Sequence, residues 1–385
     1  KDLSADQDST GKVGDVIPNI LNNGGGHTGW ADAAIVVPWT VYQKYGDVRI
    51  LQNQYESMKK WIGYMENRAG NDFLWDNDWH YGDWLSFDAS SASYMGAYTE
   101  TDLIATAYFS YSSNLVSKIS KILGKQNEAE YYAELSKNIN KAFLNEFVTN
   151  SGRLVSNTQT AYTLALAFNL LPEDVAQKAV KYLAQNVERF KHITTGFLGT
   201  PLISKTLTEN GRIDLAYMLL TRKNYPSWLY PVTMGATTIW ERWDGMKPDS
   251  TFQDKGMNSF NHYAYGAIGD WLYSTVAGIK MDESDPGYKS IIINPNPGGD
   301  LTFAEASYNS MYGKIKTHWQ LKDNSMELNI TVPPNTTAYV LFDSEKNIIL
   351  DGNEVTQSML EKYEGNNSRI KIGSGSYKFV YNITK

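Results

Sequence analysis

Apolar residues recur at helical spacing through most of the chain, and the pattern changes near Gly278. In residues 47–67, large apolar side chains return every three or four positions and form one broad face. Polar and aromatic loops separate successive segments of this kind. The spacing predicts helices over residues 32–45, 47–67, 99–123, 127–147, 157–170, from 172 onward, 196–208, 213–221, 230–242 and 257–277.

Beyond Gly278 the periodicity becomes that of β-strands. Apolar and polar residues alternate in 314–321 and again in 326–332, and a polar turn lies between the two segments. Further strands are expected at 338–342, 370–372 and 377–381. We therefore predict a mainly α domain over residues 1–280, followed over residues 281–385 by an antiparallel β-sandwich of about 100 residues.

Composition narrows the classes of ligand. The chain has a net charge of −7 and no basic stripe, which excludes nucleic acid as an expected partner. No apolar stretch is long enough to predict a membrane span. The absence of cysteine excludes disulfides and thiol chemistry, and it suits bacterial export as well as the cytosol; we favour a periplasmic or extracellular location. Aromatic residues make up 13%, more than a core requires, and surplus Trp and Tyr commonly line carbohydrate sites.

The histidines and aspartates do not form a metal-binding pattern. No His-Glu-x-x-His motif is present, and the spacing of Asp72, Asp76 and Asp78 fits no EF-hand loop. We therefore expect neither a metal nor a cofactor. The five histidines stand apart from one another in the sequence, at His27, His80, His192, His262 and His318.

Three loops combine carboxylates with aromatic residues: 29–32, 78–85 and 240–244. In the third, Glu241 stands between Trp240 and Trp243, and a carboxylate in such an apolar wall is a candidate proton-transfer group. All three are predicted at junctions between helices. This arrangement favours a sugar-active site. The alternative is an aromatic core with structural carboxylates that cap helices or pair with arginine.

Five motifs follow one another along the chain. They are Gly-Trp-Ala-Asp-Ala from Gly29, Tyr-Gly-Asp-Trp-Leu from Tyr81, Leu-Ile-Ala-Thr-Ala-Tyr from Leu103, Thr-Ile-Trp-Glu-Arg-Trp from Thr238 and Ser-Phe-Asn-His-Tyr-Ala from Ser259. In this order they resemble the α-L-rhamnosidases of glycoside hydrolase family 78, and the resemblance covers nearly the whole chain. It implies an (α/α)6 barrel followed by a β-sandwich, and release of terminal α-L-rhamnose from glycosides or polysaccharides with inversion at the anomeric carbon.

The resemblance also implies roles for individual residues. Glu241 matches the general base that activates water. Trp30 and Trp84 match aromatic walls of the sugar subsite, and His262 matches a partner for a sugar hydroxyl. The full set of substrate-binding residues implied is Trp30, Asp32, Asp83, Trp84, Trp243 and His262.

One part of the family's pattern is missing. The general acid of the family lies in a motif resembling Asp-Glu-Arg-x-Gly-Trp-x-Gly-Asp, which does not occur in this chain. Inverting hydrolysis needs two carboxyl groups, roughly 6.5–9.5 Å apart. We therefore expect a barrel incomplete at its N-terminus, an acid upstream of Lys1 and no activity of this chain alone. The alternatives are another (α/α)6-barrel glycosidase, glucoamylase-like or unsaturated glucuronyl hydrolase, and a non-catalytic carbohydrate-binding protein.

Overall fold

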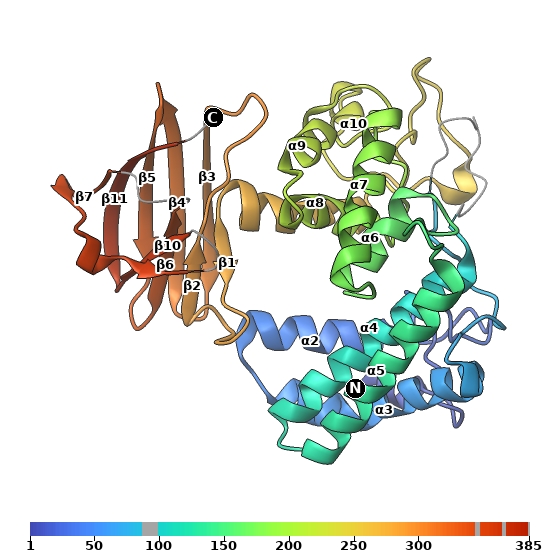
Figure 1. Ribbon diagram of the computed structural model, residues 1–385. Helices are drawn as coiled ribbons and strands as arrows, with labels where there is room; N and C mark the ends of the chain where they lie inside the picture. Colours follow the sequence, from blue (N-terminus) through green and yellow to red (C-terminus); the bar gives the residue numbers. More distant parts are fainter. Residues whose placement is uncertain (87–98, 343–346, 364–366, 384–385) are drawn as a thin grey trace. The chain divides into compact units, whose positions relative to one another are not determined.

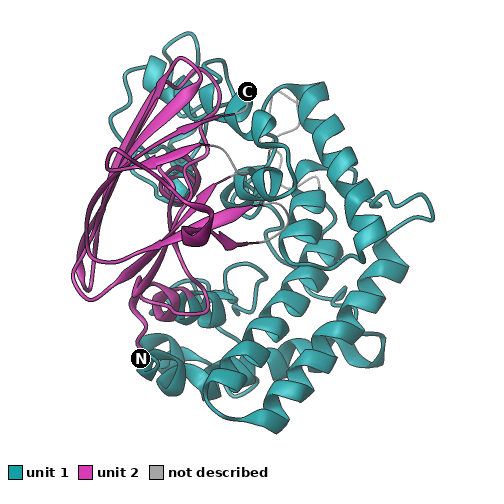
Figure 2. Cartoon of the chain, turned by 60° about the vertical axis from the view of Figure 1, so that its left-hand side comes forward, with its two compact units in different colours: residues 1–39, 48–268 teal, residues 40–47, 269–385 magenta. Residues whose placement is uncertain are grey.

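The computed structural model describes residues 1–86, 99–342, 347–363 and 367–383. The chain divides into two compact units (Figures 1 and 2). We call residues 1–39 and 48–268 the helical unit, and residues 40–47 and 269–385 the sheet unit.

The helical unit consists of helices joined by loops, in which α4 and α5 pack along each other as a hairpin (Figure 1). Long runs of apolar periodicity predicted most of these helices to within a few residues, and the first and the last of them are the exceptions. The helices are α1 Asp2–Asp6, α2 Ala33–Tyr45 (whose last turns belong to the sheet unit), α3 Arg49–Ala69, α4 Thr101–Ile122, α5 Gln126–Phe147, α6 Gln159–Ala167, α7 Glu173–Phe190, α8 Thr200–Glu209, α9 Ile213–Thr221 and α10 Leu229–Thr233, with short 3₁₀ turns at Gly70–Asp72, Lys255–Met257 and Ala264–Ala267.

Helix α7 shows how the sequence produces one of these elements. Its buried stripe comprises Ala179, Leu183 and Val187, which recur at helical spacing. Glu173 and Asp174 occupy the first turn, where negative charge interacts favourably with the helix dipole. Pro172 is the N-cap residue, with ψ of 156°, so the helix begins one residue after the proline.

Two predicted helices are mostly wrong. Helix α10 ends at Thr233, and the segment predicted to continue to residue 242 is a loop. Residues 257–277 contain only short 3₁₀ turns, α11 Ile268–Trp271 and the π-helical turn η4 Leu272–Val276. Both segments are rich in aromatic residues. Buried aromatic rings in a loop can recur at the spacing of a helix, and this spacing led to the wrong predictions.

The sheet unit contains two sheets that pack face to face through aromatic rings. Phe342 of one sheet lies 5.6 Å from Phe379 and 5.0 Å from Tyr381 of the other, measured between ring centroids. The five-stranded sheet has the order β1-β2-β6-β10-β9 and the six-stranded sheet the order β3-β4-β5-β11-β7-β8. The strands are β1 Ile279–Met281, β2 Ser290–Ile293, β3 Phe303–Ser310, β4 Gly313–Lys322, β5 Ser325–Val332, β6 Thr337–Phe342, β7 Ile348–Leu350, β8 Asn353–Glu354, β9 Glu361–Lys362, β10 Ser368–Ile372 and β11 Gly375–Asn382.

One pair of strands departs from the predicted antiparallel arrangement. Strands β2 and β6 run parallel, with Ile291 opposite Ala338. The chain between them forms β3, β4 and β5 in the other sheet before it returns, and such a crossover permits parallel pairing.

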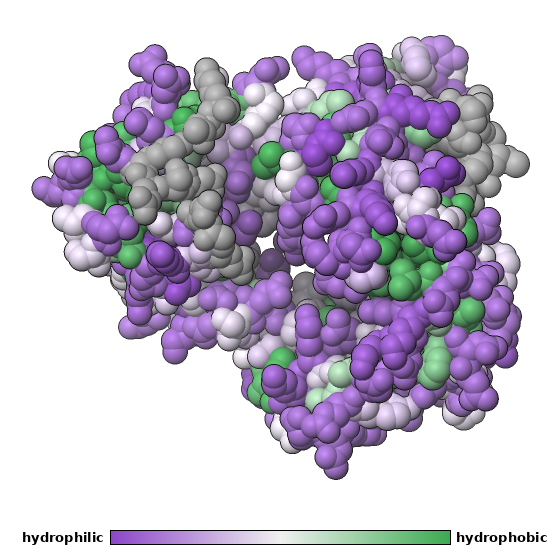
Figure 3. Space-filling model, in the orientation of Figure 1, coloured by the Kyte–Doolittle hydropathy of each residue, from purple (hydrophilic) through white to green (hydrophobic). Residues whose placement is uncertain are grey.

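The molecular surface is mainly hydrophilic on the face shown in Figure 3, with apolar side chains gathered in a few small areas. Within the described ranges, no helix is long and apolar enough to cross a membrane. The same residues contain no cluster of three or more His, Asp or Glu side chains arranged to hold a metal ion.

Candidate functional site

Asp83 connects two loops of the helical unit from a fully buried position. Its carboxylate accepts hydrogen bonds from the backbone N–H groups of Gly196 (2.7 Å), Leu198 (2.8 Å) and Gly199 (3.2 Å), and from the Thr160 hydroxyl. Burial raises the pKa of Asp83, while these hydrogen bonds oppose the rise. Asp83 therefore fixes the loop that contains Trp84 against the loop that leads into α8.

Asp32 has a comparable role at the start of α2. Its oxygens accept hydrogen bonds from the Gly29 N–H (2.9 Å), the Trp61 indole N–H (3.1 Å) and the Ser112 hydroxyl (2.6 Å). Burial raises the pKa of Asp32 as well. The carboxylate thus holds the loop that contains Trp30 onto α3 and α4.

The burial of both aspartates bears on the roles predicted from sequence. Asp32 is 1% exposed and Asp83 is 0% exposed, and the hydrogen bonds above engage both oxygens of each. Backbone N–H groups and side-chain donors hold both carboxylates, which resembles the alternative of structural carboxylates, and the predicted contact of Asp32 and Asp83 with substrate stays a prediction.

The two tryptophans predicted to form subsite walls both contact Tyr81. The ring centroid of Tyr81 lies 4.7 Å from that of Trp30 and 5.7 Å from that of Trp84. Trp79, an exposed residue, lies 4.9 Å from the same tyrosine ring. Trp30 and Trp84 are partly exposed and come from different loops, which the two buried aspartates fix in place.

Asp15 contacts Tyr81 and His27, and the sequence analysis did not predict it as a site residue. Its carboxylate is 2.7 Å from Nδ1 of His27, and it accepts hydrogen bonds from the Tyr81 hydroxyl (2.9 Å) and the Asn23 amide (2.6 Å). The His27 ring in turn packs edge-on against Trp79 and Tyr81. No motif signalled this network, because its members are separated by up to 66 positions.

A second aromatic group lies around Tyr265. The Trp243 indole stacks on the Tyr265 ring with centroids 3.9 Å apart and an interplanar angle of 9°. Phe197 contacts Tyr265 on another side and also contacts His262, at 5.3 and 5.1 Å between centroids. Trp243 and Tyr265 are both buried, so Trp243 supports the site from within, and the structure does not place it as an exposed sugar contact.

Glu241 is positioned by an extended segment that pairs with the loop of His262. The Glu241 N–H donates to the Ser259 carbonyl (2.9 Å), and the Ser259 N–H donates to Glu241 Oε2 (2.8 Å). The His262 N–H donates to the Ile239 carbonyl (2.9 Å). These hydrogen bonds hold the segment of Glu241, the predicted base, beside the segment of His262, the predicted sugar-hydroxyl partner.

Arg242, next to Glu241 in sequence, forms an ion pair with Asp244. Arg242 Nε lies 3.0 Å from Asp244 Oδ1, and both side chains are 9% exposed. The Gln253 amide also donates to Asp244. Arg242 and Asp244 form a buried pair that stiffens the loop, whereas Glu241 remains partly exposed.

The two aromatic groups meet at Trp84 and Phe197. The Phe197 N–H donates to the Trp84 carbonyl (2.9 Å), so Phe197 lies between Trp84 and His262. Gly196 permits this approach, because a Cβ at that position would lie 2.2 Å from the Trp84 oxygen. Contacts therefore run continuously from Trp30 through Tyr81, Trp84 and Phe197 to His262, with Glu241 on the segment paired to the His262 loop.

Comparison with known proteins agrees with this architecture. Residues 1–276 match the family model described as the bacterial alpha-L-rhamnosidase 6 hairpin glycosidase domain, and residues 278–356 match the bacterial alpha-L-rhamnosidase C-terminal domain. The predicted fold class and the predicted family are thereby confirmed, with a six-hairpin glycosidase domain followed by a sheet-rich C-terminal domain.

Individual relatives are similar over almost the whole chain. An alpha-L-rhamnosidase of Formosa agariphila is 40% identical over 381 residues, which cover 97% of this chain and 40% of the relative. The crystal structure of the Streptomyces avermitilis alpha-L-rhamnosidase, complexed with L-rhamnose, superimposes with a TM-score of 0.89 at 38% identity, over 98% of this chain and 35% of that one. The structure of the alpha-L-rhamnosidase from Dictyoglumus thermophilum gives a TM-score of 0.89 at 33% identity, and the match covers 99% of this chain and 42% of that one. The chain thus spans well under half of the length of these relatives.

Proposed function

Because the chain belongs to the bacterial α-L-rhamnosidase family, we propose that its helical unit forms part of an active site that hydrolyses α-L-rhamnosides in glycosides or polysaccharides. The observation that carries the proposal is the pairing of the Glu241 segment with the His262 loop, whose His262 ring contacts Phe197. Carbohydrate recognition needs this combination, since apolar ring faces stack on sugars while polar groups bind hydroxyls.

In this proposal Glu241 is the general base. Its Oε2 accepts the Ser259 N–H, which orients the carboxylate and leaves Oε1 to take a proton from water. Attack by that water on the anomeric carbon, opposite the leaving oxygen, inverts the configuration.

We assign the substrate-binding roles by the exposure of each side chain. Trp30 and Trp84 are partly exposed and offer ring faces to the sugar, and His262 offers a hydrogen-bonding nitrogen. Asp32, Asp83 and Trp243 are buried, so we assign them to positioning the residues that touch substrate.

We further propose that the general acid comes from outside these 385 residues. Among the described carboxylates around the aromatic rings, Asp32 and Asp83 are buried and engaged by protein donors, and Asp15 is held by His27, Tyr81 and Asn23. None of these three is placed to protonate a leaving alkoxide. An acid from another segment, roughly 6.5–9.5 Å from Glu241, would complete the inverting pair.

The test uses the longer protein and this chain side by side, with p-nitrophenyl α-L-rhamnoside as substrate and the α-glucoside as comparison. Glu241→Gln in the longer protein should lower kcat by about 10²–10⁴-fold with KM nearly kept. Glu361→Gln, an exposed carboxylate on the sheet unit, is the matched control and should change neither. NMR of the first product should show the inverted anomer.

A separate comparison of substrates tests where the general acid lies. This chain alone should be inactive on the ordinary glycoside and least impaired on dinitrophenyl rhamnoside, whose leaving group hardly needs a proton. Equal rates for the two lengths of protein on the ordinary substrate would place the acid within residues 1–385. Wild-type turnover of the Glu241→Gln protein would remove Glu241 from the mechanism.

A further inference from the structure

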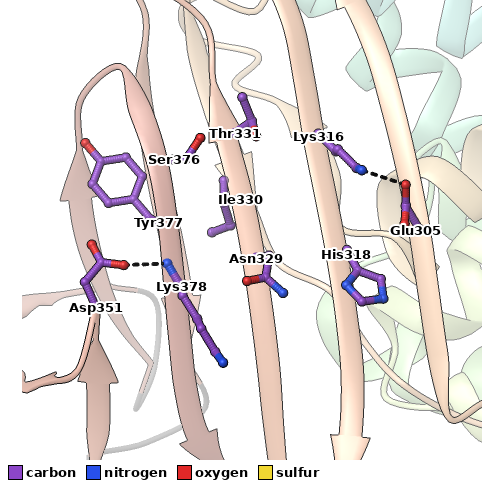
Figure 4. A pocket seen from close by; sticks show the side chains of 10 residues that line it. All are labelled: Glu305, Lys316, His318, Asn329, Ile330, Thr331, Asp351, Ser376, Tyr377 and Lys378. Atoms are coloured by element: carbon purple, nitrogen blue, oxygen red, sulfur yellow. Dashed lines mark hydrogen bonds and ion pairs between the residues drawn. The ribbon is translucent and has the colours of Figure 1, made fainter.

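The outer face of the six-stranded sheet carries a shallow polar hollow of about 450 Å³ (Figure 4). It lies on the sheet unit, whereas Glu241 and its neighbours belong to the helical unit. Side chains from β3, β4, β5 and β11 contribute most of its lining, among them Glu305, Lys316, His318, Asn329, Ser376 and Lys378.

Strand register arranges these side chains in rows. Glu305 lies opposite His318, His318 opposite Asn329, and Asn329 opposite Lys378, so one row crosses four strands. Residues opposite each other in an antiparallel pair point to the same face. With strands about 4.8 Å apart, three gaps give a row of about 14 Å. A second row, formed by Ser307, Lys316, Thr331 and Ser376, runs beside the first.

The charges of this face largely neutralise one another. Lys316 Nζ lies 2.7 Å from Glu305 and Lys378 Nζ lies 3.4 Å from Glu327. Hydrogen bonding with Lys316 lowers the pKa of Glu305, so the pair stays ionised near neutral pH. A face with paired charges gives no net attraction to an anionic polymer, and it retains many donors and acceptors for a neutral polyhydroxylated ligand.

An exposed aromatic ring adjoins the rows. Phe303, the first residue of β3, is 58% exposed and points to the same face as Glu305, which lies two positions after it. It pairs with Gln320, which makes it a diagonal neighbour of His318. A phenyl ring left on a polar sheet face contributes nothing to the core, but it offers an apolar surface to the C–H face of a sugar ring.

We propose that this face binds a neutral oligosaccharide, laid across β3, β4, β5 and β11 with a sugar ring against Phe303. The histidine, amide and hydroxyl groups of the two rows would bind its hydroxyls. The site would be separate from the Glu241 site, and it would hold a glycan substrate near the enzyme without taking part in hydrolysis.

The experiment is a binding titration of the 385-residue chain with neutral tetrasaccharides of rhamnose, galactose, glucose and xylose, at millimolar concentration. Calorimetry gives the affinity, and amide NMR shifts give the location. At least one oligosaccharide should bind and shift resonances of β4 and β5. The double variant His318→Ala/Asn329→Ala, and separately Phe303→Ala, should weaken binding by roughly tenfold or more, since each removes direct contacts.

Controls separate this site from the proposed active site. Lys371→Ala, an exposed lysine on the other sheet, and Trp84→Ala should leave the affinity at the strand face unchanged. The substituted side chains are exposed or half-buried, so thermal unfolding should match that of the wild-type chain. In the longer protein, the double variant should keep kcat on p-nitrophenyl rhamnoside.

Three results would overturn the proposal: no binding of any neutral oligosaccharide to the wild-type chain, unchanged affinity in the double variant, or stronger binding of polygalacturonate than of every neutral sugar. None of them depends on hydrolysis, so they leave the role of Glu241 untouched.

Discussion

Replacement of Asp83 by asparagine should destabilise the helical unit through one identifiable hydrogen bond. The carboxylate oxygens receive two donors each: Oδ1 from Leu198 and Gly199, and Oδ2 from Thr160 and Gly196. An asparagine that keeps its oxygen at the Oδ1 position turns its NH2 toward the other pair. The Thr160 hydroxyl can rotate and accept from this NH2, but the Gly196 N–H loses its partner.

The size of the effect follows from that geometry. A buried N–H left without an acceptor costs about 1–3 kcal/mol, and the remaining bonds lose the strength that an ionised acceptor gave them. We expect Asp83→Asn to cost about 2–4 kcal/mol of unfolding free energy. A domain of this size loses about 2–4 °C of Tm per kcal/mol, so the shift should be about 5–15 °C. Thr160→Val removes one donor and orphans no backbone group, and it should cost about 1 kcal/mol.

Two measurements check the reasoning. Thermal and urea unfolding of both variants give the free energies, and amide hydrogen exchange reports the local consequence. Peptides that contain residues 195–200 should exchange faster in Asp83→Asn, while strands of the sheet unit keep wild-type protection. The account would fail if Asp83→Asn lay within about 0.5 kcal/mol of wild type. Equal losses in Asp83→Asn and Thr160→Val would also contradict it.

Two further predictions concern neighbouring groups. Asp15→Asn should raise KM for rhamnosides roughly tenfold with a smaller change in kcat, because Asp15 orients the Tyr81 ring that contacts Trp30 and Trp84 and is not the proposed base. Loss of stability with KM unchanged would leave Asp15 a purely structural residue. His80 accepts the Gly82 N–H at Nδ1 and lies 2.9 Å from the Thr101 carbonyl at Nε2, and burial lowers its pKa. The folded state therefore resists a proton that the unfolded chain takes up, so stability is retained above about pH 6.5 and falls below it. His80→Gln should flatten the dependence of unfolding free energy on pH between about 7 and 5.5. An unchanged slope would mean that other groups cause this pH dependence.

The sequence by itself determined the helices with long apolar stripes and the alternating strands, because periodicity over many residues records which face is buried. Helix α3 and strands β4 and β5 are of this kind. It also led to the predictions that Glu241 is the general base and that His262 binds a sugar hydroxyl, because their motifs resemble a family, and both roles stay predictions. It misjudged residues 234–242, since Ile239, Trp240 and Trp243 are apolar in a loop as they would be in a helix, and their partners lie in the 259–262 segment and at Tyr265.

Only the tertiary structure decided how the carboxylates are held. Asp32 and Asp83 stand in aromatic loops, as Glu241 does, and nothing in their sequence neighbours distinguishes a buried carboxylate from a partly exposed one. The difference arises from donors far away in the chain, Ser112 for Asp32 and the 196–199 amides for Asp83. Asp15 and His27 form a network for the same reason. A hydrogen bond depends on distance in space, and the local pattern of residues carries no record of which remote groups the fold brings within 3 Å.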